Sequence, residues 1–157
     1  MTQITEATRR AGTKVARLSA GVMLGGLLLQ FLLGIYVNLY VPASSITGSH
    51  TSSEMMGSSG GMMSGMSRAL SGAPSLMLHM MFGWLLFLGA IGSLGGAFLS
   101  RQRRAITAAV GGLVAIAVAG FGGLEFMSTG HDAYSFVMAI GFAGAIASYA
   151  SEAYVLR

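Results

Sequence analysis

Four long stretches of this chain carry almost no charge, and no other feature restricts the fold as strongly. They run over residues 18–41, 75–99, 105–126 and 131–155. At a rise of about 1.5 Å per residue, a helix of each length crosses a hydrocarbon core of about 30 Å. The pattern therefore predicts an all-α polytopic membrane four-helix bundle, with one transmembrane domain over residues 18–157.

The composition agrees with this class and excludes several others. Charged residues make up 9% of the chain and hydrophobic residues 54%, whereas soluble domains carry roughly a quarter charged residues. The 24 glycines suit transmembrane helices, since small residues let two backbones approach closely. The absence of cysteine excludes disulfides, thiolate metal sites, iron–sulfur clusters and covalent c-type haem.

The basic residues predict the orientation. They precede the first stretch, separate the second from the third and end the chain, and only Arg68 falls on the other side: Arg9, Arg10, Lys14, Arg17, Arg101, Arg103, Arg104 and Arg157. Lys and Arg concentrate on the cytoplasmic side of membrane proteins. We expect a multi-pass protein of the plasma membrane with both termini inside. Residues 1–17 form a cytoplasmic segment, and the first stretch is a retained anchor because it exceeds the roughly 7–15 residues of a signal-peptide core.

A weak internal repeat is visible between the two halves. The segment that starts at Leu78 can be laid over the segment that starts at Gly130, which pairs His79 with His131 and Trp84 with Phe136. A true repeat would form two similar hairpins related by an axis along the membrane normal.

His79 and His131 are the candidate ligands. Both are expected at the outer ends of their helices, the second and the fourth. Ionisable residues in membrane spans usually face the bundle interior, and facing helices of a four-helix bundle can build a cofactor site. Two neutral imidazoles there could hold one haem iron. The alternative interpretation is that each histidine is an interfacial residue bonded to a carbonyl or a lipid headgroup.

The segments "LLLQFLLGIYVNLYVP" and "LMLHMMFGW", with Gln30 and Gly34 in the first, make the chain resemble one four-helix half of the haem A synthase family. The resemblance covers about residues 20–150. It implies a bis-histidine haem site near the outer face. The chain departs from the family in having a single bundle, no arginine after either histidine and no cysteine pair in its outer loop. We therefore do not expect the haem A synthase reaction.

The resemblance and the histidine pair together indicate a haem b with both axial positions filled. Such a haem serves electron transfer, and the chain would then be an electron carrier or an accessory subunit of a respiratory or oxidising membrane complex. Arg68 is the candidate partner of the propionates, while Trp84 and Phe136 are candidates to wall the porphyrin or to serve as ordinary packing. Nothing in the chain resembles a nucleophile–base pair, a phosphate loop or a nucleic-acid patch, which favours a non-catalytic role with lipids and membrane subunits as partners.

The outer loop, residues 43–74, consists mainly of Gly, Ser and Met. Its thioethers and one imidazole are soft ligands that suit Cu(I): Met55, Met56, Met62, Met63, Met66 and His50. The other interpretation is an adaptable apolar loop that docks a partner. The alternative function is thus a non-haem accessory membrane subunit whose Met-rich loop handles copper or docks a partner.

Four further polar residues fall inside the apolar stretches. Gln30 and Asn38 are expected to form interhelical hydrogen bonds, as polar residues in membrane bundles do. Glu125 is a candidate proton relay, haem neighbour or interfacial acid, and the last is favoured. Glu152 is expected to be interfacial, near the cytoplasmic end of the fourth stretch.

Overall fold

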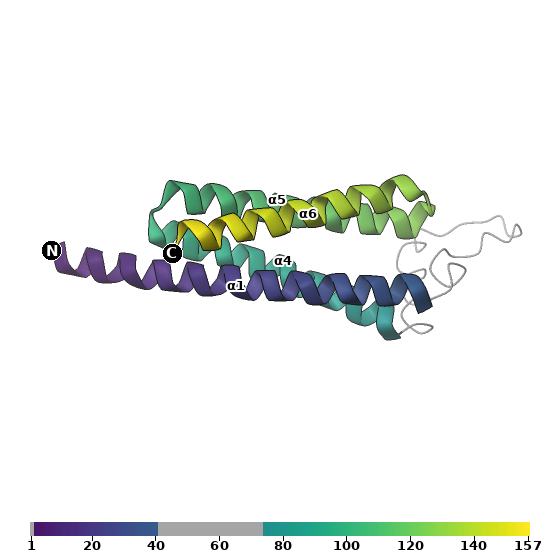
Figure 1. Cartoon of the computed structure of the whole chain (residues 1–157), viewed down its shortest axis with the longest axis horizontal. Helices are drawn as coiled ribbons and strands as arrows, with labels where there is room; N and C mark the ends of the chain where they lie inside the picture. The colour runs from purple at the N-terminus through teal and green to yellow at the C-terminus, as the bar shows by residue number, and fades with distance from the viewer. Residues whose placement is uncertain (1, 41–73) are drawn as a thin grey trace, which may run out of the picture.

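The computed structural model describes residues 2–40 and 74–157 of the chain, and this part folds into four helices (Figure 1). The helices are α1 (Thr2–Tyr40), α4 (Pro74–Ser100), α5 (Arg103–Thr129) and α6 (Asp132–Val155). Each is long and apolar enough to cross a membrane. The prediction of an all-α chain with four such helices is confirmed.

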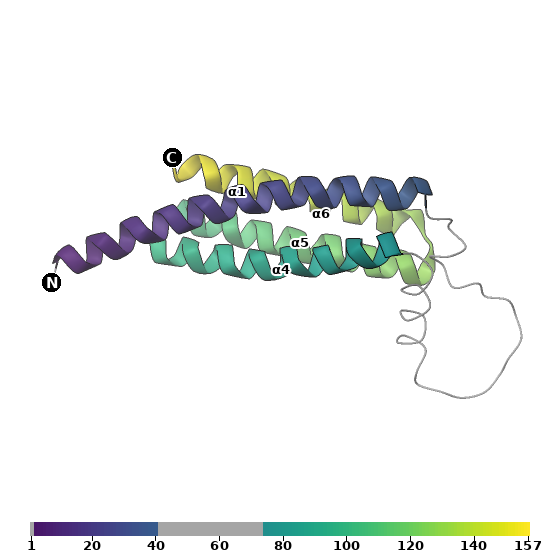
Figure 2. The same cartoon turned by 90° about the horizontal axis from the view of Figure 1, so that it is seen from below.

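The helix bounds agree with the apolar stretches for α4, α5 and α6, but α1 begins earlier. Its helix starts at Thr2 rather than near residue 18, so most of the basic N-terminal segment is helical. Hydropathy marks where a helix could enter an apolar phase, whereas a helix in water can continue through charged residues. Figure 2 shows the N-terminal part of α1 projecting beyond the other three helices.

Local backbone geometry explains how the short connections turn. Pro74 opens α4, where its fixed φ suits a first helical turn. Between α4 and α5, Arg101 adopts a left-handed conformation with φ 55°. Between α5 and α6, Gly130 takes φ 69° and its N–H donates to the carbonyl of Phe126, the arrangement in which helices commonly end on glycine.

The four helices form a ring in which each packs against two others. Helix α1 packs against α4 and α6, and α5 packs against the same two helices. We call the end that holds the α4–α5 connection and Arg157 the basic end. We call the end where α1 stops, α4 starts and α5 turns into α6 the loop end (Figure 1).

Glycines allow the closest helix contacts. A Cβ built on Gly141 of α6 would lie 2.6 Å from the backbone nitrogen of Ala119 on α5, and one on Gly122 of α5 would lie 2.8 Å from that of Met138 on α6. A Cβ on Gly12 of α1 would lie 2.7 Å from the backbone carbonyl carbon of Leu99 on α4. Both α1–α4 and α5–α6 are therefore joined by backbone-to-backbone contact, which small residues permit.

The outward faces of all four helices carry large apolar side chains. Examples are Leu28 on α1, Trp84 on α4, Phe121 on α5 and Phe136 on α6, each at least half exposed. The described interior contains a cluster of buried residues: Met23, Leu27, Leu86, Ala90, Ile116, Ala145 and Tyr149. Apolar surface of this extent normally contacts a partner or a membrane.

Candidate functional site

The imidazole of His79 lies between α4 and α1, near the loop end. The residue is in the second turn of α4 and is half-buried. Its Nε2 lies 3.2 Å from the amide nitrogen of Gln30, and that amide nitrogen also donates to the backbone carbonyl of His79 at 3.1 Å. A Cβ built on Gly34 would lie 3.3 Å from the ring carbon Cε1. The absence of a side chain at Gly34 makes room for the ring.

These contacts assign the tautomer of His79. The Gln30 amide must present its NH₂ group to the His79 carbonyl, because an amide oxygen in that place would face another acceptor. The same NH₂ group is then the donor to Nε2, so Nε2 accepts and the ring proton sits on Nδ1. The imidazole is held in its neutral form with the Nε2 lone pair occupied by Gln30.

The pair leaves two polar atoms without partners. In the described part of the chain, His79 Nδ1 and Gln30 Oε1 are buried and make no hydrogen bond. Buried polar atoms are normally paired, so this interface can accept a further polar group. The predicted interhelical hydrogen bond of Gln30 is confirmed, and its partner is the candidate ligand itself. The side chain of Asn38 lies outside the described residues.

His131 occupies a different environment. It is the residue before the first turn of α6, with φ −79° and ψ 126°, and its side chain is exposed and makes no capping hydrogen bond. Its backbone N–H donates to the hydroxyl of Thr129 at 3.3 Å, and its carbonyl accepts from Tyr134 at 3.0 Å. His131 is therefore placed at the loop end, as predicted, but on the surface of the turn.

The bis-histidine haem site stays a prediction, because His79 and His131 lie in different surroundings in the described part of the chain. His79 faces α1, whereas His131 lies on the exposed turn before α6, and no hydrogen bond or ring contact joins them across residues 74–157. Trp84 and Phe136 are 65% and 67% exposed and point away from the interior. In this arrangement neither nitrogen of His79 offers a free lone pair, because Nε2 accepts from Gln30 and Nδ1 carries the ring proton. Among the described residues, no three His, Cys, Asp or Glu side chains gather around a metal position.

The remaining candidate ligands belong to the outer loop. Arg68 and the copper candidates His50, Met55, Met56, Met62, Met63 and Met66 lie outside the described residues. Glu125 is half-buried near the loop end of α5, where its carboxyl oxygen accepts from the Ser128 hydroxyl at 3.4 Å, so it has a local partner at the edge of the bundle.

A second polar site, which the sequence reasoning missed, lies near the basic end. Glu152 of α6 is completely buried, and its two carboxyl oxygens lie 3.3 and 3.2 Å from the hydroxyl of Ser93 on α4. The hydroxyl of Ser93 lies 3.1 Å from that of Ser19 on α1. The prediction that Glu152 is interfacial is wrong, because the residue is completely buried and its carboxyl bonds to Ser93 of α4. No local signal in the sequence marks this cluster, because Ser19, Ser93 and Glu152 lie 17, 7 and 3 residues from the ends of their helices at the basic end.

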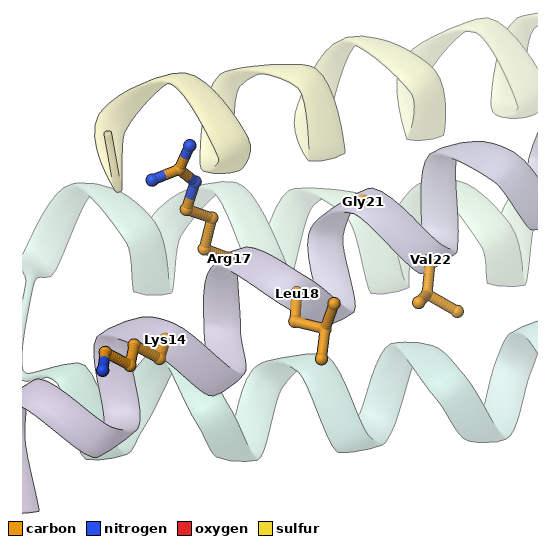
Figure 3. A pocket seen from close by; sticks show the side chains of 5 residues that line it. All are labelled: Lys14, Arg17, Leu18, Gly21 and Val22. Atoms are coloured by element: carbon orange, nitrogen blue, oxygen red, sulfur yellow. The ribbon is translucent and has the colours of Figure 1, made fainter.

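Two hollows also open at the basic end. One is lined by Lys14, Arg17, Leu18, Gly21 and Val22 of α1 (Figure 3). In this view Arg17 extends towards the C-terminal part of α6, while Lys14 extends along α1 towards the N-terminal end of that helix. The other lies between α5 and α6 and includes Arg103, Arg104, Ser148 and Val155. Each hollow combines cationic groups with apolar side chains, which is the chemistry of a lipid headgroup region.

Comparison with protein-family models, with curated proteins and with solved structures finds no match to this chain. The resemblance to haem A synthase rests on the segments quoted above.

Proposed function

We propose that this chain is an integral protein of the plasma membrane that works as an accessory subunit of a larger, respiratory or oxidase-type membrane complex. The observation that carries the proposal is the distribution of polarity. Large apolar side chains cover the outward faces of all four helices. Between the helices, His79 pairs with Gln30 and Ser93 pairs with Glu152. This is the arrangement that lipid and neighbouring helices require.

The charges support an orientation with both termini in the cytoplasm. Every Lys and Arg in the described part of the chain belongs to the N-terminal half of α1, the α4–α5 connection, the start of α5 or the C-terminus, and all of these are at the basic end. The positive-inside rule places that end in the cytoplasm. The two basic hollows would then meet the headgroups of the inner leaflet.

Labelling of single cysteines tests this orientation, and the native chain, which has no cysteine, is the blank. Gln102→Cys places a thiol in the α4–α5 connection, and Ser128→Cys places one at the loop end of α5; both positions are exposed. A membrane-impermeant maleimide should label the Ser128→Cys variant in intact cells. The Gln102→Cys variant should react only after the cells are permeabilised. The reverse result would refute the orientation.

The accessory role follows from what the outward faces offer a partner. Trp84 presents an exposed ring on α4 that stands edge-on to Phe87 at a centroid distance of 6.0 Å. Aromatic anchors carry much of the binding energy at protein interfaces. The Met-rich outer loop adds a second contact region, either by docking to the partner or by handling copper for it.

Native electrophoresis of gently solubilised membranes tests the role. The chain should migrate together with a haem-containing respiratory complex, and Trp84→Ala should reduce the comigrating fraction. Val114→Ala is the control, because it removes an exposed side chain from α5 without an aromatic ring. A chain that migrates alone in all three forms contradicts the proposal.

A haem b held by His79 and His131 is the second candidate; the half-buried position of His79 near the loop end favours it, and ligation would require Nε2 of His79 to exchange the Gln30 amide for iron. A haem bound there would supply one-electron transfer. The optical spectrum of the purified protein tests this candidate. A Soret band with resolved α and β bands on reduction, lost in both His79→Ala and His131→Ala, would support it, and a colourless folded preparation would exclude it.

A further inference from the structure

A chain of hydrogen-bonding groups crosses three helices near the basic end. It begins at the carboxyl of Glu152 on α6, continues 3.2 Å to the hydroxyl of Ser93 on α4 and 3.1 Å to that of Ser19 on α1. It ends 2.9 Å further, at the backbone carbonyl of Ala16. Glu152 and Ser93 have no exposed surface, so the carboxyl end of the chain is closed to solvent.

Counting hydrogens shows which protonation state lets every contact be a hydrogen bond. Three contacts join the four groups, and a hydrogen bond at each contact needs one hydrogen between its two oxygens. Ser19 and Ser93 supply one hydrogen each. If Glu152 is ionised, one of the three contacts has no hydrogen and two oxygen lone pairs face each other. If Glu152 is protonated, the carboxyl donates to Ser93, Ser93 donates to Ser19, and Ser19 donates to Ala16.

The surroundings of Glu152 also favour a neutral acid. On its own helix, the nearest titratable group along the same face is Tyr149, which is fully buried and whose hydroxyl has no partner among the described residues. Helix α4 contributes Ser93. The cations on neighbouring helices, including Arg17 and Arg103, are exposed, and in residues 2–40 and 74–157 none forms an ion pair with Glu152. Burying an unpaired carboxylate costs several kcal/mol or more.

We infer that Glu152 is a proton-binding site inside the bundle, and that the bound proton joins α6 to α4 and α1 through Ser93 and Ser19. When the carboxyl releases its proton to water at the basic end, Ser93 must turn to donate to the carboxylate. Either Ser19 then turns to donate to Ser93 and Ala16 loses its side-chain donor, or the Ser93–Ser19 contact is left without a hydrogen. A proton leaving α6 therefore changes a contact made by α1. The inference does not depend on the accessory role or on haem.

Infrared difference spectroscopy of the full-length protein tests the inference. At neutral pH the native protein should show the carbonyl stretch of a protonated carboxylic acid, and this band should fade as the pH is raised. Glu152→Gln should remove the band, because its amide can donate to Ser93 in the same place but carries no acid proton. Ser93→Ala should keep the band and shift it to higher frequency, since the acid loses its acceptor. Glu125→Gln is the control and should leave the band unchanged.

Chemical labelling gives an independent readout that does not depend on the variants. A hydrophobic carbodiimide adds to a protonated carboxyl, and rearrangement yields an N-acylurea whose mass equals the acid plus one carbodiimide. Mass spectrometry should find this adduct on Glu152 at neutral pH and less of it at alkaline pH. If the native protein shows neither the acid band nor an adduct on Glu152, the carboxyl is ionised and the inference is overturned. If the band survives in Glu152→Gln, the proton belongs to another group, and the inference is likewise overturned.

Discussion

Gly141 of α6 faces the backbone of α5, and we predict that a single methyl group there separates the two helices. A Cβ at Gly141 would lie 2.6 Å from the nitrogen of Ala119 and 2.8 Å from the carbonyl oxygen of Ala115. Ordinary contact begins near 3.4 Å, so the helices must move apart by about 0.8 Å. Both opposing atoms belong to the backbone, so rotation of a side chain cannot relieve the contact.

The expected strain from the added methyl group in Gly141→Ala is about 1–3 kcal/mol, the usual range for overpacking a close-packed interface. Alanine also gains about 0.5–1 kcal/mol over glycine within a helix, which opposes the strain. The matched control is Gly120→Ala on α5, where a Cβ meets nothing within 4 Å. This variant receives the same gain in helix propensity without the strain. The difference between the two variants therefore isolates the cost of separating α5 from α6.

The assay is reversible unfolding in mixed micelles, with SDS added to a mild detergent and the fluorescence of the single tryptophan, Trp84, as the signal. We expect Gly120→Ala to equal or exceed the native free energy of unfolding, and Gly141→Ala to fall below Gly120→Ala by about 1–3 kcal/mol. Equal values for the two variants would refute the claim that backbone contact at Gly141 joins the helices.

Three further predictions use the same unfolding assay. Gln30→Leu removes the amide that holds the His79 ring and should lower the free energy of unfolding by about 0.6–2 kcal/mol. In the double variant Gln30→Leu/His79→Leu no buried imidazole is left unpaired, so the loss should be smaller. An equal or larger loss in the double variant would contradict the pairing. In Gly130→Ala, the alanine must adopt the left-handed conformation that Gly130 has at the end of α5, which should lower the free energy of unfolding by about 1–2 kcal/mol. An unchanged stability would show that the turn does not depend on glycine. Arg101→Gly should stabilise the α4–α5 connection by up to about 1 kcal/mol, because Arg101 has a positive φ; a loss of stability would mean that the arginine side chain outweighs its backbone strain.

The candidate site shows where reasoning from the sequence reached its limit. The sequence marks His79 and Gln30 as polar residues in apolar helices and predicts an interhelical hydrogen bond for Gln30, but it does not identify the partner. Their pairing depends on how α1 and α4 rotate against each other, which no local pattern encodes. The sequence predicts that Glu152 is interfacial because it is near the cytoplasmic end of the fourth apolar stretch, yet the residue is completely buried and its carboxyl bonds to Ser93 of α4.

The sequence alone determined that the described chain forms four helices, and it located the ends of α4, α5 and α6 closely. It could do so because long uncharged stretches, Pro74 and Gly130 act locally, through hydropathy and backbone geometry. Only the tertiary structure decided which helix faces meet, and so which polar groups are joined: His79 with Gln30, and Glu152 with Ser93. The physical reason is that helices apolar on all sides carry little amphipathic signal. Close contact at glycines and interior hydrogen bonds determine which helix faces pack together. These interactions exist only once the bundle has assembled.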